Sequence, residues 1–282
     1  MNRRQLLQVL VSSAPYFLAG RTKIARAGMR QRLACAARSD QLTRYGAQLR
    51  RLPGIEIEDW LDPTFPERAE AAVPVLQEAL AGYQGRILLS GPFIDLNPGS
   101  AERLVRKATR QRFQECYRFA RAIGAREIIF LSSYLPLINL PFYDRGWLDQ
   151  SVAFWSAYLE ELDPQVIVSL CNTFEYHPDL MLKVVEAVNR PQFRLGFDLG
   201  HFLVYGREPL SDWLRKTAAR TSSVYVHSND GHVDTHDEPS RGVLTREQMQ
   251  RVVAAVGPDA NVILKMNNKD SLERSVAWIE AS

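Results

Sequence analysis

The chain has 282 residues, and its 35 Lys and Arg against 32 Asp and Glu give a formal net charge of +3. Apolar residues make up 46% and charged residues 24% of the sequence, a balance typical of a folded globular protein and not of a disordered chain. The basic residues are scattered along the sequence, so we expect no nucleic-acid partner. The three cysteines lie far apart without C-x-x-C spacing, which argues against a disulfide framework or a thiolate zinc site.

Residues 1–27 are predicted to form an export signal or an N-terminal extension that precedes the folded domain. Their Arg-Arg-x-Leu-Leu opening resembles a twin-arginine signal, and residues 25–27 have the small-x-small pattern of a cleavage site. Such a signal would make the protein periplasmic or exported. The alternative is an amphipathic helix that stays attached, in a cytoplasmic protein. The apolar run over residues 6–19 is too short and too interrupted for a membrane span, so no stable membrane insertion is expected.

Short apolar runs alternate with longer amphipathic ones from residue 28 onward, which is typical of repeated βα units around a parallel sheet. Eight runs are predicted to be strands: 32–37, 54–59, 86–90, 127–131, 166–170, 194–198, 223–227 and 261–266. Between them, residues 101–123 show the apolar period of a helix, which Gly124 should end. We therefore predict an α/β fold with one domain over residues 28–282, a single (β/α)8 TIM barrel.

Four of the five histidines fall between residues 193 and 237, accompanied by carboxylates at short spacings. The pairs are Asp198-x-x-His201, His227-x-x-Asp230 and Asp234-x-His236. Imidazole and carboxylate groups are ligands of borderline divalent metals such as zinc, manganese or iron. An extended backbone would turn both side chains of Asp234-x-His236 to one side. Because TIM barrels carry their chemistry where the strands end, these groups predict a functional site. The alternative is a set of polar loop residues that satisfy one another.

Six motifs follow the predicted strands in order. They are GPFIDLNPGS after the third strand, residues 172–175 after the fifth, FDLGH at the sixth, VHSND at the seventh, VDTH beyond it and the closing SVAWIE. Together they resemble the xylose isomerase-like TIM barrels, a superfamily that includes sugar-phosphate isomerases and epimerases and the type IV apurinic endonucleases. The resemblance covers about residues 30–280. It implies a metal held by a Glu, an Asp, a His and a Glu at the ends of strands five to eight. In the epimerases the two Glu residues also move the proton.

The chain departs from this pattern at both glutamates. Asp198 and His227 match the family's Asp and His, but Cys171 and Lys265 stand where the two Glu residues are expected. A metal between Asp198 and His227 would have only two protein ligands. The ammonium group of Lys265 would also repel it.

The endonuclease branch of the superfamily uses further ligands, which this chain retains only in part. Ser90 and Leu131 stand where that branch has additional histidines, whereas its remaining trio matches His201, Asp234 and His236. The sequence shows neither a full three-metal site nor a basic DNA-facing rim. An apurinic endonuclease-type phosphodiesterase is therefore the least favoured function.

Two arrangements of the site remain open. In the first, one divalent ion (Zn, Mn or similar) moves to the retained trio and keeps open positions for a substrate. In the second, no metal binds, and Lys265 replaces its charge, paired with Asp198 and hydrogen-bonded toward His227. A desolvated amine of this kind could act as a base or as a Schiff-base nucleophile on a carbonyl compound.

The candidate catalytic residues are the groups near the predicted mouth that could move a proton: Cys171, Glu175, Lys265 and His227. Cys171 could be a low-pKa thiolate, or simply a small packed side chain at the end of a strand. Glu175 could point a carboxylate into the pocket, or could favour the start of a helix.

The candidate substrate-binding residues are Glu58, Trp60, Arg241 and His232. A tryptophan such as Trp60 can stack on a sugar face or merely cover the barrel top. Arg241 could reach a phosphate or a carboxylate. His232 lies in a Gly-containing loop, where it either contacts a ligand or is solvated.

The leading functional hypothesis is a sugar isomerase or epimerase that acts on a small polyhydroxylated carbonyl compound. A divalent ion would polarise the substrate's oxygens while a base moves a proton next to the carbonyl. The alternative is a non-catalytic binding protein that keeps the pocket without the paired glutamates. Either function predicts a small polyol or sugar as partner, and the sequence assigns no oligomeric state.

Overall fold

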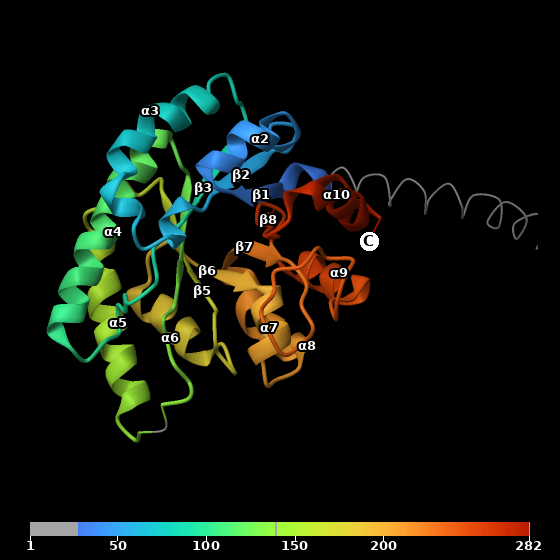
Figure 1. The fold of residues 1–282 in the computed structure, drawn as a ribbon. Helices are drawn as coiled ribbons and strands as arrows, with labels where there is room; N and C mark the ends of the chain where they lie inside the picture. Colours follow the sequence, from blue (N-terminus) through green and yellow to red (C-terminus); the bar gives the residue numbers. More distant parts are fainter. Residues whose placement is uncertain (1–27, 139, 282) are drawn as a thin grey trace, which may run out of the picture.

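Eight parallel strands close into one barrel in the computed structural model, which describes residues 28–138 and 140–281 (Figure 1). The strands are β1 Leu33–Ala37, β2 Gly54–Ile57, β3 Arg86–Ser90, β4 Glu127–Leu131, β5 Ile167–Cys171, β6 Phe193–Asp198, β7 Thr221–Val226 and β8 Asn261–Leu264. Pairing of β8 with β1 closes the ring. All eight predicted strands and the single (β/α)8 barrel are confirmed, although β2, β7 and β8 end short of their predicted bounds. The predicted export signal, residues 1–27, lies outside the described residues.

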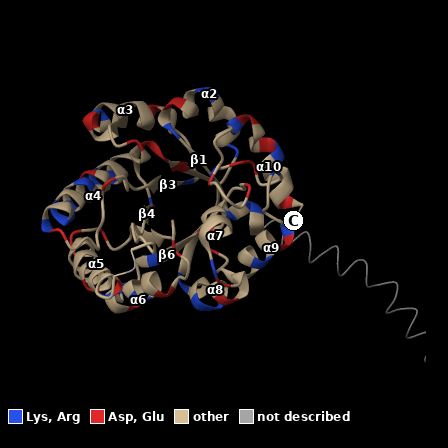
Figure 2. Cartoon of the chain, turned by 60° about the horizontal axis from the view of Figure 1, so that its bottom comes forward, with Lys and Arg blue, Asp and Glu red and all other residues tan. Residues whose placement is uncertain are grey.

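Helices form a ring around the strands (Figure 2). They are α2 Ser39–Leu49, α3 Ala69–Ala79, α4 Arg103–Ile123, α5 Tyr143–Leu159, α6 Asp179–Val188, α7 Leu199–Tyr205, α8 Leu210–Thr217, α9 Arg246–Ala255 and α10 Leu272–Glu280. Short 3-10 helices add η1 Asp59–Leu61, η2 Phe65–Glu67, η3 Ala218–Arg220 and η4 Lys269–Ser271. Lys and Arg are interspersed with Asp and Glu over the helices in Figure 2. Within the described ranges, no helix combines the length and the apolar character needed to cross a membrane.

The helix α4 shows how the amphipathic pattern builds this ring. Its apolar residues recur at helical spacing, so that Phe113 and Phe119 are both buried against the barrel. The Glu102 carboxylate accepts a backbone N–H of the first turn and caps the helix. Gly124 ends it with a left-handed φ of 75°, a conformation that costs glycine little. The predicted helix and its glycine cap are confirmed.

Below the mouth, the barrel interior is filled by apolar side chains. Its buried cluster consists of Ala34, Ala36, Leu88, Ile129, Cys171, Tyr225 and Ile263. Every residue of β1 is fully buried, as expected of a parallel strand that is covered on both faces. This packed interior separates two polar regions, one at each end of the barrel.

At the end where the strands begin, Glu127 is the centre of a buried hydrogen-bond network. Its Oε1 accepts hydrogen bonds from the hydroxyls of Ser169 at 2.5 Å and Ser222 at 2.8 Å. Its Oε2 accepts from Nδ2 of Asn261 at 2.8 Å. Both oxygens of this buried carboxylate are therefore satisfied by neutral donors, which is how a structural polar group is stabilised in a core.

Candidate active site at the barrel mouth

Four side chains converge at the end where the strands finish. We call them the ligand cluster: His201, His227, Asp234 and His236, whose potential ligand atoms all lie within 4.8 Å of one another. His201 lies on α7, His227 directly follows β7, and the other two lie in the loop beyond it. The Oδ2 atom of Asp234 lies 3.0 Å from Nε2 of His201 and 3.0 Å from Nε2 of His236. The predicted convergence of acid and imidazole groups at one opening is thus present.

Each imidazole of the ligand cluster is held by an oxygen on its outer side. The Nδ1 atom of His201 lies 2.9 Å from the Asn172 carbonyl oxygen, and Nδ1 of His236 lies 2.9 Å from the Lys265 carbonyl oxygen. The Nε2 atom of His227 lies 2.9 Å from the Asp198 carboxylate. Because these oxygens only accept, each ring directs one N–H outward and turns its other nitrogen toward the cluster. This is the arrangement that orients histidines around a bound metal.

Two buried atoms of the cluster lack a partner. Among the described residues, neither Oδ1 of Asp234 nor Nδ1 of His227 has a hydrogen bond, and they lie 3.7 Å apart. Leaving such atoms unsatisfied costs about 1–3 kcal/mol each. A divalent cation would satisfy both, and three imidazoles with one carboxylate suit zinc, manganese or iron. The residues present therefore fit the divalent metal that the sequence predicts.

Burial and the neighbouring histidines act in opposite directions on the Asp234 carboxylate, and the net result keeps it ionised. Burial alone would raise the pKa of Asp234, but hydrogen bonds from His201 and His236 hold it well below its usual range. Burial alone would lower the pKa of His201, but Asp198 and Asp234 raise it to about 9. An incoming metal ion must therefore displace protons from the cluster, as is usual for histidine sites.

The loop that carries Asp234 and His236 turns where an extended chain was expected. His236 has a left-handed φ of 52°, so the prediction of an extended Asp234-x-His236 segment is wrong. That conformation costs a residue other than glycine roughly 1–2 kcal/mol. The backbone N–H of Asn267 donates to the His236 carbonyl oxygen at 3.0 Å and helps to hold the turn. Strain of this kind concentrates at functional sites.

Asp198, also predicted as a metal ligand, lies beside the ligand cluster and lines a cavity at the mouth together with His201, Asp234 and His236. One of its carboxylate oxygens receives hydrogen bonds from Nε2 of His227 and from the backbone N–H of His201, both at 2.9 Å. Burial alone would raise its pKa, but the two histidines hold that pKa far below the usual range. Asp198 thus orients two members of the cluster.

Gly200 is required by the packing of His227. A Cβ atom at position 200 would lie 2.0–2.4 Å from three atoms of the His227 ring. No side chain fits in that space, so the glycine of the FDLGH motif allows the imidazole to lie against α7.

Lys265 follows β8 and points its ammonium group into the mouth. Its Nζ atom donates to the Ser90 hydroxyl at 3.0 Å and lies 3.7 Å from Glu56 and 3.8 Å from Glu58. The predicted pairing with Asp198 is therefore wrong, because Glu56 and Glu58 take that place. Burial alone would lower the pKa of Lys265, but these two carboxylates raise it above the usual value. A neutral lysine base or Schiff-base nucleophile is accordingly not supported.

Glu56 is the buried acid that sequence reasoning missed. It has no exposed surface, and its Oε1 accepts from the Ser90 hydroxyl at 2.7 Å and from the Tyr225 hydroxyl. Its Oε2 has no hydrogen-bond partner within residues 28–138 and 140–281. Burial raises its pKa, while Lys265 acts to lower it. A signal was available, because Glu56 stands between two isoleucines of a barrel strand and must therefore face the interior.

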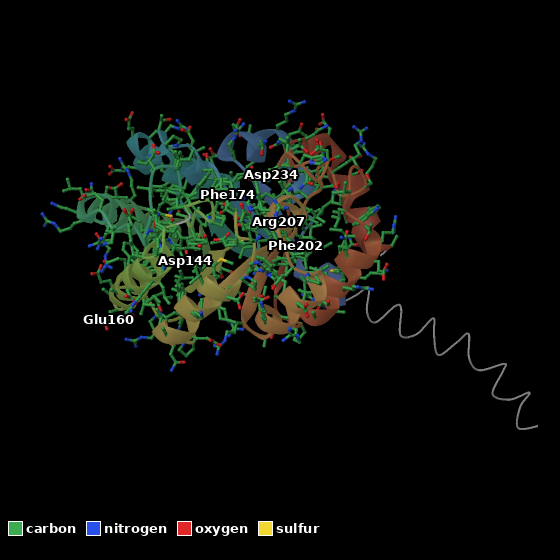
Figure 3. The ribbon with its side chains drawn as sticks, turned by 90° about the horizontal axis from the view of Figure 1, so that it is seen from below. Asp144, Glu160, Phe174, Phe202, Arg207 and Asp234 are labelled. Carbon is green, nitrogen blue, oxygen red and sulfur yellow. The ribbon has the colours of Figure 1, made fainter. Side chains whose placement is uncertain are left out.

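Two cavities of about 290 Å³ each open at the mouth. The inner cavity is lined by three members of the ligand cluster (His201, Asp234 and His236), by Lys265, and by the apolar and aromatic side chains of Leu61, Phe93, Ile129, Leu131, Phe174 and Tyr205. The outer cavity is lined by Arg38, Glu58, Asp62 and Asn267, and it shares Leu61, His236 and Lys265 with the inner one. In Figure 3, Asp234 and Phe174 lie close together near the middle of the molecule, whereas Glu160 lies at its edge. A larger groove of about 710 Å³ lies at the start of β2 and β3, away from the cluster.

Three of the four predicted catalytic residues line neither cavity: Cys171, Glu175 and His227, the last of which is fully buried beneath the mouth. Cys171 is fully buried in the barrel interior, and burial raises the pKa of its thiol well above the usual value. It is therefore a packed thiol, and the thiolate hypothesis is wrong. Glu175 is buried as well, where it accepts hydrogen bonds from the Ser132 hydroxyl and from the backbone N–H of Thr173. Burial raises its pKa, and its carboxylate holds the loop after β5.

Of the four predicted substrate-binding residues, only Glu58 lines a cavity at the mouth. Trp60 is 1% exposed and packs edge-on against Phe65 and Phe119, so it covers the barrel and offers no face to a sugar. The Arg241 side chain is 75% exposed and pairs with Glu238 at 3.1 Å. His232 is exposed and lies outside both cavities. These three positions are corrections to the sequence prediction.

The fold and the ligand cluster define a TIM-barrel protein with a histidine-rich candidate metal site at the ends of its strands. Residues 51–282 match the model of the xylose isomerase-like TIM barrel family. The chain belongs to that family, as the motifs of its sequence predicted.

Solved structures with this fold include sugar epimerases and a protein treated with zinc. A D-tagatose 3-epimerase-like protein is similar with a TM-score of 0.71 at 19% identity, over 89% of this chain and 98% of that one. The TTHB071 protein of Thermus thermophilus, soaked with ZnCl2, has a TM-score of 0.67 at 22% identity over 89% and 99%. The 3-keto-D-glucoside 4-epimerase YcjR of E. coli has a TM-score of 0.67 at 11% identity over 89% and 99%.

Proposed function

We propose that this protein is an isomerase or epimerase that acts on a small polyhydroxylated carbonyl compound bound at the barrel mouth. The observation that carries the proposal is that three members of the ligand cluster, His201, Asp234 and His236, line a cavity that Lys265 also lines, while two buried atoms of the cluster have no hydrogen bond among the described residues. Sugar epimerases among the proteins of similar fold support the choice of substrate class.

The protein groups have distinct roles in this proposal. His201, His227, Asp234 and His236 hold the divalent ion, and Asp198 orients His227 from outside. When bound, such an ion polarises the oxygens of a substrate carbonyl.

Lys265 and the opposite wall act on the substrate. The ammonium group of Lys265 donates a hydrogen bond to a substrate oxygen and stabilises the negative charge that develops there. The apolar wall of the inner cavity, which includes Phe93 and Phe174, excludes water from this charge.

The base must differ from the family pattern, because Cys171 and Lys265 occupy the two glutamate positions. Glu58 is the carboxylate that lines the outer cavity next to Lys265, and its side chain is 15% exposed. It lies 3.8 Å from Nζ of Lys265 and 3.7 Å from Nζ of Lys269. We assign Glu58 as the base that removes the proton next to the carbonyl, a role that typically contributes about 10²–10⁴ in rate.

Metal content and solvent exchange test the proposal. Purified protein should contain one divalent ion per chain by elemental analysis. In D2O it should exchange a carbon-bound hydrogen of at least one ketose in a sugar panel, detected by NMR. Glu58→Gln should slow this exchange by about 10²-fold or more while zinc stays bound. Glu78→Gln, on the outer surface of α3, serves as the matched control.

A second function, a non-catalytic sugar-binding protein, is favoured by the replacement of both family glutamates. It predicts that sugars bind while no carbon-bound hydrogen exchanges with any of them. An exchange signal that depends on Glu58 would rule it out.

A further inference from the structure

The two cavities at the mouth adjoin each other. Each has a volume of about 290 Å³, and Leu61, His236 and Lys265 line both of them. Binding sites for small ligands usually measure about 300–1,000 Å³. Either cavity alone lies at the lower limit of that range, whereas the two together are well within it. The two cavities are thus large enough for a ligand with two units.

The two cavities differ in chemistry. The inner cavity combines the ligand cluster with an apolar wall, so it suits a unit with a few oxygens on one edge and C–H groups on the other. The outer cavity presents Arg38, Glu58, Asp62 and Asn267, which together offer both donors and acceptors. Mixed donors and acceptors of this kind suit hydroxyl groups, each of which both donates and accepts.

A phosphate group fits the outer cavity poorly. Helix α2 begins beside Arg38, but the Asp59 carboxylate already accepts from the backbone N–H of Ser39 at 2.8 Å and from its hydroxyl at 2.6 Å. The helix N-terminus, which would otherwise attract an anion, is therefore occupied. The carboxylates of Glu58 and Asp62 balance the charges of Arg38 and Lys265 in the lining of this cavity, so the lining has no excess of positive charge to attract a phosphate dianion. The second unit is consequently neutral.

Resting on the proposed function, we propose that the substrate is a keto sugar that carries a second, neutral glycosyl unit. The ketose occupies the inner cavity beside the ligand cluster, and the glycosyl unit occupies the outer cavity. Arg38 and Asp62 contact its hydroxyl groups, while Lys265 lies where the two units join.

Calorimetric binding to the full-length, zinc-loaded protein tests this inference. The probes are D-fructose, fructose 6-phosphate, and the three glucosyl-fructoses turanose, maltulose and isomaltulose, which differ in the fructose hydroxyl that carries glucose. At least one glucosyl-fructose should bind about tenfold or more tightly than D-fructose, which corresponds to about 1.4 kcal/mol.

A pair of arginine variants locates the second unit. Arg38→Ala should remove most of the preference for the glucosyl-fructose while the affinity for D-fructose stays unchanged. Arg44→Ala is the matched control, because Arg44 is an exposed arginine of the same helix that stacks on Tyr45 and lines neither cavity. It should leave both affinities unchanged.

The outcomes separate this inference from the proposed function. If D-fructose binds as tightly as every glucosyl-fructose, or if fructose 6-phosphate binds most tightly, the two-unit substrate is wrong while the proposed function stands. If none of the sugars binds, both are wrong.

Discussion

Both ends of the barrel bury a carboxylate, but they treat it differently. At the end where the strands begin, Glu127 accepts three hydrogen bonds from neutral donors, and neither oxygen is left over. At the mouth, Glu56, Asp234 and His227 each keep one buried atom without a hydrogen bond among the described residues. The Glu127 carboxylate is thus satisfied as it stands, whereas the mouth leaves acid and imidazole atoms free for groups that the protein itself does not supply.

The difference separates stability from binding within one fold. A satisfied buried network stabilises the native state, while an unsatisfied one costs free energy that a ligand can return on binding. In TIM barrels the end where the strands begin typically contributes stability and the opposite end contributes chemistry. Substitutions at the end where the strands begin should therefore change the free energy of unfolding, whereas substitutions at the mouth should change zinc affinity.

The largest effect is expected at Asp234. Asp234→Asn removes the charge that three imidazoles share, so zinc affinity should fall by more than about 100-fold, beyond the usual cost of losing an outer partner. A competition titration against a chelator measures this affinity. Asp230→Asn is the control, because Asp230 lies in the same loop and only accepts backbone N–H groups of His232 and Val233. Wild-type zinc affinity in Asp234→Asn would show that the cluster is not a metal site.

An intermediate effect is expected at Glu127, where the substitution should lower stability and leave zinc affinity unchanged. Glu127→Gln places an amide N–H2 group against groups that donate, so the free energy of unfolding should fall by about 1–3 kcal/mol. Urea unfolding measures this change, and zinc affinity should stay the same. Glu247→Gln, an exposed side chain paired with Arg251, should change stability by less than about 0.5 kcal/mol. A loss of zinc affinity in Glu127→Gln would remove the distinction between the two ends.

The smallest effect is expected at Asp198. Asp198→Asn keeps an acceptor for the His227 ring but removes the charge, so zinc affinity should fall by about tenfold. The same competition titration checks it, with Asp230→Asn again as reference. A loss as large as that of Asp234→Asn would instead identify Asp198 as a ligand.

The sequence predicted the fold well because the fold depends on repeated local patterns. Eight apolar runs, separated by helical periods such as that of α4, leave few arrangements other than a closed barrel. The ligand cluster was predictable for the same reason, because its four residues lie at the ends of β6 and β7 or shortly beyond.

The finer geometry of the mouth depends on contacts between distant strands, which no local pattern reveals. The sequence predicted Trp60 at the rim of the pocket, but helix η1 directs its side chain against Phe65 and Phe119. Glu56 looked like part of an apolar strand, and only the closed barrel brings it against Lys265 and Tyr225. The rotation of each imidazole ring likewise decides which residues bind a metal ion and which only orient a ligand. The Nε2 atom of His227, for example, points outward to Asp198.

Position 265 serves two purposes with two different parts of one residue. Its carbonyl oxygen orients His236, and this backbone group is present whatever side chain stands there. Its side chain contributes a positive charge to the lining of both cavities. The side chain at position 265 can therefore be replaced, and the type of reaction with it, while the backbone carbonyl oxygen still orients the His236 ring. At position 265, the backbone group that orients His236 and the side chain that faces the cavity can therefore change independently.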